Sequence, residues 1–518
     1  MIRQRPLISL LIFVTVLVVA AAASVALTRP SVVGVGGQAS AAAVRATVTL
    51  QVRTIDGDKE LRGAGAGIMA GVPVTVKDQS GATRTATRDG SGIATVANVD
   101  AGGMITVTAT APRGYVTFPT TVAAQTVIAN GGRVDVPLYR DDQQWLTWGR
   151  TNDRRRVGPP AGTPSGSWLW TTDPGNNVEF PPSLAYGMVV YGSYHGYLCA
   201  DSQTTGQNVW REYPGDKWGR VSKFANQVAV SSWVENGRRI ARVFYADLSG
   251  IVGSRDLFTG AVDWEITAGK GNGTKGKRIQ FKSIEASPLV LGKTVYICTR
   301  FNRSGSKAGL WALDRSSGKV RWFKALGRTS RSKIGSSPAY AGGRLFVATY
   351  DGYVYALRSS NGKVLWRKKI GGQFYSTPAV SGTRLFIGNK SNGRMYCLST
   401  RNGRVLWRTK RLGTSVHGSP AVYGGRVFVG AGNRFYALKA SNGRQVWRKS
   451  TKRRIWGSAS ILRGVVYYSD FGHTYARTTR KGALVWSTNV GRYSPVTATR
   501  HLIIVCDRKS FYAYRPKD

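Results

Sequence analysis

The stretch Ser336–Arg367, SSPAYAGGRLFVATYDGYVYALRSSNGKVLWR, contains a whole unit that recurs along the chain. Three short runs in it, Leu345–Thr349, Tyr353–Leu357 and Val364–Trp366, have the β-branched and aromatic composition typical of strands. Gly-Gly, Asp-Gly and Asn-Gly pairs between the runs supply the positive φ that tight hairpins need. Together with the short Pro-Ala-Tyr run in front, the pattern predicts four antiparallel strands in about 40 residues, which is the blade of a β-propeller.

The unit is marked by a small residue, a glycine six positions later and a tryptophan four positions after that, and this pattern occurs seven times. Successive tryptophans lie 39 to 58 positions apart, a period that belongs to repeat architectures whose units must stack. We expect each ring to fill the gap between neighbouring sheets. With one upstream residue added, the tryptophans assigned this structural role are Trp170, Trp210, Trp264, Trp322, Trp366, Trp407, Trp447 and Trp486.

The two ends of the repeat region predict how the propeller closes. Ala513 occupies the small-residue position of a last unit, but the chain ends before the matching glycine and tryptophan. Gly166 and Trp170 stand four positions apart upstream of the first complete unit. We therefore expect Gly166–Thr172 to supply the outer strand of the last blade, which removes an open sheet edge. Counting Trp170 with the other seven predicts eight blades over residues 141–518.

Residues 1–27 predict a membrane segment. Arg3 and Arg5 precede an uncharged run of 21 residues, which is long enough to span a bilayer and longer than the core of most cleaved signals. The favoured interpretation is an uncleaved single-pass anchor in the cell membrane, with the N-terminus inside and the bulk of the protein outside. The alternative is a signal peptide followed by secretion, because Ser24-Val25-Ala26 is a usable cleavage site.

Two further regions precede the repeats. Residues 28–45 are rich in Gly, Ala and Ser and predict a flexible linker. Residues 46–140 contain short alternating runs, such as Ile93–Val96 and Ile105–Ala109, and predict a small β-sandwich. The order of these runs resembles transthyretin-like or carboxypeptidase-regulatory-like modules. That resemblance implies a stalk or spacer.

The net charge of +48 is concentrated in the repeats. Lys319–Arg454 contains 29 Lys and Arg residues against a single acid, Asp351. A basic surface of this kind attracts polyanions, and the alternative is a surface that only keeps the protein soluble. Nucleic acid is a poor match for an exported protein, so anionic lipid head groups or envelope polymers are the better candidates.

Residues that could carry chemistry are scattered. The four cysteines lie singly within apolar runs, where we expect them to pack as small hydrophobic residues; Cys199 and Cys506, in neighbouring blades, are the one candidate bridge. The four histidines fall in different units without metal-ligand spacing. The chain has neither a P-loop nor a Gly-x-Ser-x-Gly motif. These observations predict no metal site and no catalytic residue.

The repeat points to a known family. The pattern Ala312-x-Asp-x-x-x-Gly318-x-x-x-Trp322 resembles the tryptophan-docking repeat of pyrroloquinoline-quinone (PQQ) propellers, and Trp145–Arg150 resembles the lead-in before their first blade. One branch of that family consists of quinoprotein dehydrogenases. The other consists of non-catalytic binding proteins of the BamB type.

The resemblance to the first branch implies an adjacent Cys–Cys disulfide over the quinone, a tryptophan beneath it and oxygen ligands around Ca²⁺. This chain has no Cys-Cys pair and few acids among its repeats. The comparison therefore favours a non-enzyme without a cofactor. A PQQ-dependent quinoprotein dehydrogenase is the alternative.

One position per unit, just ahead of the innermost strand, predicts a partner-binding rim at the mouth of the central channel. When the units are aligned on Ser-Pro-Ala, this position carries aromatic and charged residues, which are typical of binding pockets. The alternative is a set of variable loop residues. The candidate partner-binding residues are Glu179, Trp218, Glu285, Tyr375, His417, Trp456 and Arg492, with Gly335 at the equivalent place in the fourth unit.

The sequence thus predicts an exported all-β protein with an N-terminal hydrophobic helix, a small β-sandwich and an eight-bladed β-propeller. Its predicted function is that of a binding or scaffold protein of the cell envelope. The predicted partner is another envelope protein or an anionic envelope polymer.

Overall fold

The computed structural model describes residues 47–56, 73–89, 93–174, 177–267, 283–300, 308–326, 333–493, 496–507 and 509–517. In this part of the chain nearly every element is a strand, and the one α-helix is α1 (Ala124–Ala129), which confirms the all-β class. None of the helices described there is long and apolar enough to cross a membrane. The predicted membrane segment (residues 1–27) and linker (28–45) lie outside the described residues.

Thr47–Tyr139 forms two four-stranded sheets. Alternate side chains of the strands, such as Leu50 with Val52 and Val74 with Val76, are fully buried in one apolar core. The sheet orders are β4-β1-β8-β6 and β3-β2-β5-β7, with β1 (Thr47–Asp56), β2 (Pro73–Lys77), β3 (Thr83–Thr87), β4 (Ile93–Asp100), β5 (Met104–Ala109), β6 (Val116–Thr117), β7 (Thr120–Ala123) and β8 (Arg133–Tyr139).

Eight further four-stranded antiparallel sheets follow among the described residues, and seven of them use consecutive strands. The first four are β10 (Ser183–Ala185), β11 (Met188–Gly192), β12 (Leu198–Ser202), β13 (Asn208–Glu212); β14 (Ala229–Glu235), β15 (Arg238–Ala246), β16 (Val252–Asp256), β17 (Val262–Ile266); β18 (Leu289–Leu291), β19 (Thr294–Thr299), β20 (Gly309–Asp314), β21 (Val320–Ala325); and β22 (Ala339–Ala341), β23 (Arg344–Ala348), β24 (Tyr353–Arg358), β25 (Val364–Lys369). The next three are β26 (Ala379–Ser381), β27 (Arg384–Gly388), β28 (Met395–Ser399), β29 (Val405–Arg408); β30 (Ala421–Tyr423), β31 (Arg426–Ala431), β32 (Arg434–Lys439), β33 (Gln445–Ser450); and β34 (Ser460–Leu462), β35 (Val465–Ser469), β36 (Thr474–Thr478), β37 (Leu484–Thr488).

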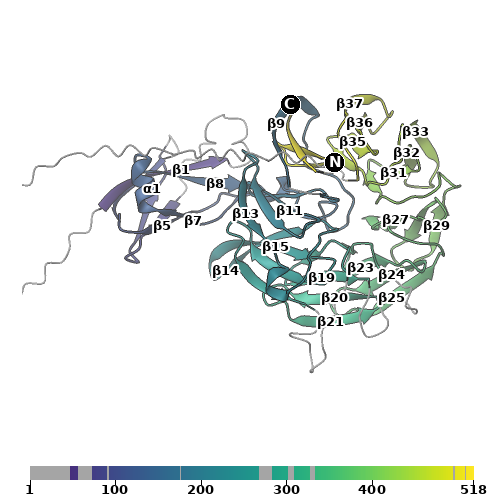
Figure 1. Ribbon diagram of the computed structural model, residues 1–518, viewed down its shortest axis with the longest axis horizontal. Helices are drawn as coiled ribbons and strands as arrows, with labels where there is room; N and C mark the ends of the chain where they lie inside the picture. The colour runs from purple at the N-terminus through teal and green to yellow at the C-terminus, as the bar shows by residue number, and fades with distance from the viewer. Residues whose placement is uncertain are drawn as a thin grey trace, which may run out of the picture. The chain divides into compact units, whose positions relative to one another are not determined.

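The last sheet joins the two ends of the repeat region. It consists of β38 (Thr497–Ala498), β39 (Ile503–Cys506), β40 (Phe511–Pro516) and, as its outer strand, β9 (Pro164–Thr172). Ala513 of β40 stands opposite Trp170 of β9. Figure 1 shows the sheets succeeding one another around a common centre, from β11 past β20 and β27 to β35.

Neighbouring sheets meet through a tryptophan of one and a glycine of the next. Each glycine has a positive φ, and a Cβ added to it would lie 2.5 to 2.9 Å from the indole ring, too close for any other residue. Six of the tryptophans also donate Nε1–H to a backbone carbonyl near that glycine, over 2.8 to 3.1 Å. The glycines, in chain order, are Gly206, Gly260, Gly318, Gly362, Gly403, Gly443 and Gly482, and they lie against Trp170, Trp210, Trp264, Trp322, Trp366, Trp407 and Trp447.

Trp486 also packs on the next sheet, but without the glycine contact of the other seven tryptophans. The equivalent glycine of the next sheet is Gly166, and no atom lies within 4 Å of the Cβ position there. The Trp486 ring instead packs edge-on against Tyr514, with 5.6 Å between centroids.

Backbone amides and hydroxyl groups link successive sheets close to the centre. In five successive sheets a serine or threonine stands two positions before the innermost strand, and its oxygen accepts a hydrogen bond from a backbone N–H of the preceding sheet. The bonds are Gln227 N to Ser287 Oγ (3.0 Å), Ser287 N to Ser337 Oγ (2.9 Å), Ser337 N to Thr377 Oγ1 (3.1 Å), Thr377 N to Ser419 Oγ (2.9 Å) and Ser419 N to Ser458 Oγ (2.8 Å). The motif used for alignment therefore also carries a chain of hydrogen bonds between sheets.

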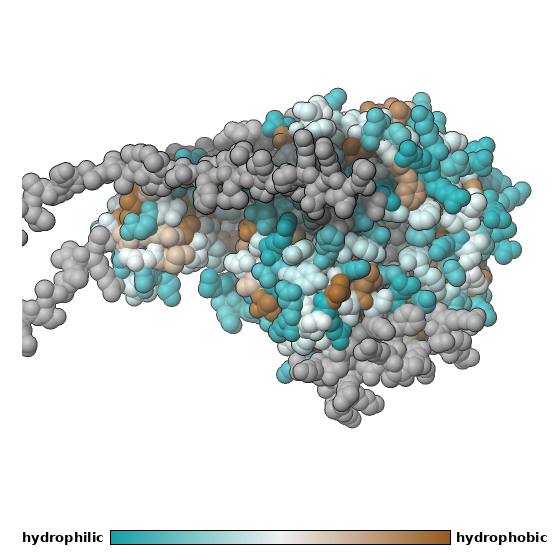
Figure 2. All heavy atoms as spheres, viewed as in Figure 1, coloured by the Kyte–Doolittle hydropathy of each residue, from teal (hydrophilic) through white to brown (hydrophobic). Residues whose placement is uncertain are grey.

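Residues 46–518 form one compact unit, because the two-sheet module packs on the first repeat sheets. Phe118 lies 4.9 Å from Tyr186 and 5.0 Å from Phe258, and Tyr139 lies 5.8 Å from Tyr186 (ring centroids). These aromatic contacts fix the module directly to the first repeat sheets. A stalk or spacer, as predicted for this region, does not need such contacts. On the face seen in Figure 2, apolar side chains form small separate groups among hydrophilic ones.

Replacing Gly403 by alanine is expected to destabilise the fold strongly. Its φ of +72° disfavours any side chain, and the new Cβ would lie 2.6 Å from Trp366 Cε3. We expect a loss of about 1 to 2 kcal/mol from the backbone alone and about 1 to 3 kcal/mol more from overpacking, measured by urea unfolding.

Gly382→Ala is the matched control. Gly382 has a φ of +57° and nothing within 4 Å of its Cβ position, so it reports the backbone cost without the tryptophan contact. Equal losses in the two variants would contradict the docking role of Trp366.

Removing one hydroxyl from the chain between the sheets should also lower stability. Ser419→Ala leaves the buried Thr377 N–H without its acceptor, at a cost of about 1 to 3 kcal/mol in the free energy of unfolding. Ser441→Ala, at an exposed position of the same sheet, should change it by less than about 0.5 kcal/mol. A negligible effect of Ser419→Ala would show that the hydroxyl chain contributes nothing.

Candidate functional site

The segment Trp145–Val157 occupies the centre of the repeat sheets. Its backbone carbonyls accept hydrogen bonds from the middle residue of six innermost strands, so one short peptide contacts β10, β14, β22, β26, β30 and β34. The bonds are Leu184 N to Trp145 O (3.0 Å), Val230 N to Leu146 O (2.7 Å), Tyr340 N to Asn152 O (2.7 Å), Val380 N to Asp153 O (2.8 Å), Val422 N to Arg155 O (3.0 Å) and Ile461 N to Arg156 O (2.9 Å). We call Trp145–Val157 the axial segment.

Arginines give the axial segment its shape. Arg150, Arg154 and Arg156 all have positive φ, a conformation that costs free energy in residues other than glycine. The Arg154 guanidinium is buried and donates to the carbonyls of Pro338 (3.0 Å) and Pro288 (3.3 Å). Burial lowers the pKa of both Arg154 and Arg156 to about 9, so both remain protonated at neutral pH.

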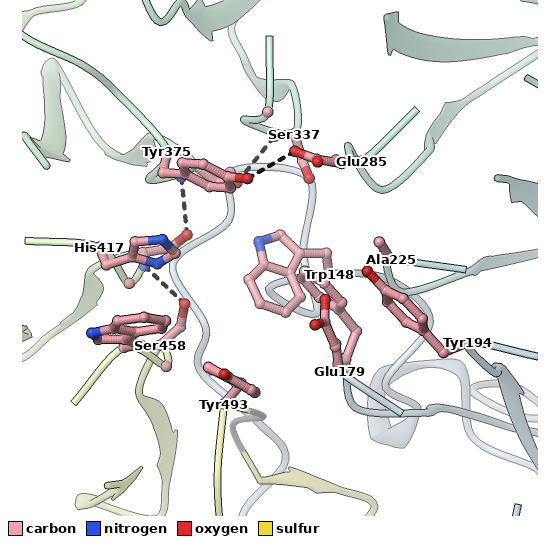
Figure 3. A pocket seen from close by; sticks show the side chains of 17 residues that line it. Trp148, Glu179, Tyr194, Ala225, Glu285, Ser337, Tyr375, His417, Ser458 and Tyr493 are labelled. Atoms are coloured by element: carbon pink, nitrogen blue, oxygen red, sulfur yellow. Dashed lines mark hydrogen bonds between the residues drawn. The ribbon is translucent and has the colours of Figure 1, made fainter. Parts of the chain in front are cut away.

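A pocket of about 310 Å³ lies beside the axial segment. Each of the eight repeat sheets contributes to it with the residues just ahead of its innermost strand, and Trp148 is contributed by the axial segment. The lining residues are Trp148, Glu179, Phe180, Tyr194, Ala225, Glu285, Gly335, Ser337, Tyr375, Thr377, His417, Gly418, Ser419, Trp456, Gly457, Ser458 and Tyr493. Figure 3 shows the Trp148 indole between the side of Tyr375 and His417 and the side of Glu179 and Tyr194. We call this cavity the axial pocket.

Stacked rings form one wall of the axial pocket. His417 lies between Tyr375 (4.7 Å, 23° between planes) and Trp456 (5.5 Å, 20°), and Tyr493 follows Trp456 at 5.9 Å (ring centroids). Each ring belongs to the next sheet along the chain. Burial, followed by the nearby Lys390 ammonium, lowers the pKa of His417 to about 4, so this imidazole is neutral at physiological pH.

Two carboxylates form part of the opposite wall. Glu285 forms an ion pair with Arg300, and its Oε2 accepts the Tyr375 hydroxyl at 3.0 Å. The pKa of Glu179 is raised by burial and by the negative charge of Glu285, while Arg492 acts in the opposite direction. The two acids are therefore close enough to influence each other across the pocket.

Five of the seven predicted rim residues line this pocket: Glu179, Glu285, Tyr375, His417 and Trp456. Trp218 does not, and the prediction for it is corrected. It belongs to a 3₁₀ turn (Asp216–Trp218) between β13 and β14, and Ala225 holds the lining position in that sheet. The second unit has Gln227-Val228-Ala229 in place of Ser-Pro-Ala, so the alignment had no anchor there.

Arg492 is the second correction. It lies outside the lining, with its guanidinium 5.2 Å from the Tyr493 ring centroid and 5.7 Å from that of Phe471. Tyr493, its chain neighbour, faces the pocket instead. Arg492 affects the site through its charge near Glu179.

Sequence reasoning missed Trp148, Phe180, Tyr194 and Tyr493. Trp148 lies ahead of the repeats, in the motif that resembles the lead-in of the family. That motif indicated the family but did not indicate where Trp148 lies in the structure. Tyr194 comes from the turn between β11 and β12 rather than from the aligned position. The alignment could find only residues that repeat.

The residues present do not fit the quinone and Ca²⁺ of the dehydrogenase branch. Cys199, Cys298, Cys397 and Cys506 are buried and unbridged, in β12, β19, β28 and β39 respectively, so the adjacent disulfide of those enzymes has no counterpart. Of the two carboxylates in the pocket, Glu285 is already engaged by Arg300 and Tyr375. Within the described residues, no three His, Cys, Asp or Glu side chains are grouped as metal ligands.

The depressed pKa of His417 predicts a pH-dependent stability. Between about pH 6.5 and 4 the unfolded chain binds a proton at this imidazole that the folded chain excludes, so the free energy of unfolding falls as the pH falls through that window. Between pH 7 and pH 5, the free energy of unfolding measured with urea should decrease less for His417→Gln than for the wild type. His195→Gln, at an exposed position, should keep the wild-type decrease, and equal decreases in all three proteins would contradict the assignment.

Comparison with known proteins agrees with this architecture. The profile of a family described as "Outer membrane protein assembly factor BamB" matches residues 161–309 and 306–518. BamB of Legionella pneumophila is 26% identical over 210 residues, which cover 40% of this chain and 47% of the relative. BamB of Salmonella typhimurium is 29% identical over 257 residues, 45% of this chain and 62% of the relative. The matched region thus spans between about half and three fifths of these curated relatives.

Solved structures share the fold at low identity. BamB from Moraxella catarrhalis superposes with a TM-score of 0.51 and 16% identity, covering 68% of this chain and 98% of that one. A quinohemoprotein alcohol dehydrogenase from Pseudomonas putida superposes with a TM-score of 0.58 and 12% identity, covering 76% and 82%. The family profile extends over well more than half of the sequence. The chain therefore belongs to the family of the outer membrane protein assembly factor BamB, among the PQQ-like β-propeller repeat proteins.

Proposed function

We propose that this protein is a non-catalytic binding or scaffold protein of the cell envelope, with another envelope protein as its partner. The observation that carries the proposal is the convergence of all eight repeat sheets on the axial pocket. A repeat fold gains binding specificity at positions where the residue differs from one unit to the next. Here the position just ahead of the innermost strand carries residues that include Gly, Tyr, His, Trp and Glu.

The family and its named relatives support an assembly role. The relatives at 26% and 29% identity carry the name of an outer membrane protein assembly factor, which is a binding function. The pocket residues and the dispersed cysteines support the same class, because they do not match the needs of the quinone enzymes. On the basis of this comparison, we propose an envelope protein as the kind of partner.

We also propose how the parts are used. The eight sheets act as the blades of a closed ring, residues 46–140 act as a β-sandwich fixed to its first blades, and residues 1–27 hold the protein in the cell membrane with the bulk outside. A secreted form after signal cleavage is the alternative for the last point. The basic stretch Lys319–Arg454 favours an anionic envelope polymer as the second candidate partner.

Crosslinking in intact cells tests the proposed function. The full chain carrying an affinity tag is crosslinked and captured from envelopes in low and in high salt. For this comparison the salt is set before the crosslinker is added, so a specific protein partner should be crosslinked in both salts, whereas an anionic polymer should be crosslinked only in low salt. The proposal would be overturned if the chain captured neither a protein nor a polymer.

Trp456→Ala should weaken capture of the protein partner on the order of ten-fold, as truncation of an aromatic hot spot does. Trp456 is 37% exposed and packs on His417 and Tyr493, so its loss should also lower the midpoint of thermal unfolding, and capture is compared well below that midpoint. Tyr423→Ala is the matched control, because Tyr423 is 40% exposed and lies outside the pocket lining. Equal capture by both variants would exclude the pocket as the recognition site.

A further inference from the structure

The axial pocket is poorly suited to a cation. Glu285 already has the Arg300 guanidinium and the Tyr375 hydroxyl as partners, and Arg492 partly offsets the charge of Glu179. The Trp148 ring has the Arg156 guanidinium at 4.3 Å from its centroid, and Lys390 Nζ lies 5.0 Å from that of Tyr375. Because both rings already hold a cation, a second positive charge gains little from them.

An anion is disfavoured as well. Glu179 and Glu285 both line the pocket, and burial and their mutual repulsion raise the pKa of Glu179. A negative ligand would add a third like charge within a partly desolvated space. The electrostatics therefore select a neutral ligand.

Hydroxyl groups of the pocket lining add directional donors. Ser337, Thr377, Ser419 and Ser458 are 4 to 6% exposed, and the oxygen of each accepts a backbone N–H. Since a hydroxyl has one hydrogen of its own to donate, these four groups offer O–H donors along the lining. The carboxylates of Glu179 and Glu285 offer acceptors.

The pocket thus combines donors, acceptors and aromatic surface around a neutral space. Its volume of about 310 Å³ is at the small end of the ~300 to 1,000 Å³ of ligand pockets. A sugar ring matches each property: it is compact and uncharged, its hydroxyls both donate and accept, and its C–H faces are apolar and pack on aromatic rings.

We propose that the axial pocket binds one neutral pyranose unit of an envelope glycan. The sugar contacts Trp148 and the stacked wall of Tyr375, His417 and Trp456, and its hydroxyls donate to Glu179 and Glu285. This inference rests on the proposed function, because it names a ligand of the same binding site. The glycan would bring the partner or the polymer to the scaffold.

Saturation-transfer NMR on the full wild-type chain tests the inference directly. The probes are the methyl pyranosides of glucose, galactose, mannose and N-acetylglucosamine, with arginine amide as the cation probe and acetate as the anion probe. At least one pyranoside should receive saturation from the aromatic protons, and an excess of the corresponding free monosaccharide should reduce that transfer. Absence of transfer to every pyranoside, or tighter binding of either charged probe, would overturn the proposal.

Glu179→Gln locates the binding site, because it removes the charge and half of the acceptor capacity while keeping the shape of the side chain. The affinity for the sugar should fall at least five-fold, whereas Glu235→Gln, at an exposed position elsewhere, should leave it unchanged. An equal effect of the two variants would overturn the location. Envelope capture without sugar binding would refute this inference alone, and sugar binding without envelope capture would refute the proposed scaffold function instead.

Discussion

The axial segment is the constraint on which the remaining structure depends. Its carbonyls hold the middle residues of six innermost strands, so the sheets are fixed to one peptide as well as to their neighbours. Backbone groups buried at the centre of the ring would otherwise lack partners. Arg150, Arg154 and Arg156 adopt left-handed backbone conformations where the segment turns, and the buried Arg154 guanidinium holds it through hydrogen bonds to the Pro338 and Pro288 carbonyls.

Two further layers of contacts surround this centre. Next to the axis, serine and threonine hydroxyls connect one sheet to the next, and farther out seven of the eight repeat tryptophans lie on the glycine of the following sheet. The inner layer also supplies the lining of the axial pocket. The residues that line the axial pocket are therefore positioned by the same contacts that connect neighbouring sheets.

Repetition explains both what could be predicted from the sequence and what could not. The tryptophan and glycine spacing indicated the blade, and the pair Ala513 and Trp170 indicated the joining of both ends, because these residues recur with a fixed period. Tyr375 and His417 could be placed near one another since Pro-Ala follows both at the same distance, and Glu179 and Trp456 since their units keep part of that motif. Trp218 could not, because its unit lacks that motif, and Trp148 could not, because its position depends on long-range hydrogen bonds of a segment that occurs once.

The account's central claim is that recognition occurs at the axial pocket. Hydrogen exchange of the full chain, followed by mass spectrometry with and without detergent-solubilised envelope, tests it most directly. The account predicts slower exchange on addition of envelope in the segments ahead of β26, β30 and β34, around Tyr375, His417 and Trp456. Protection confined to outer strands such as β25 or β33, with no change around the pocket, would contradict it.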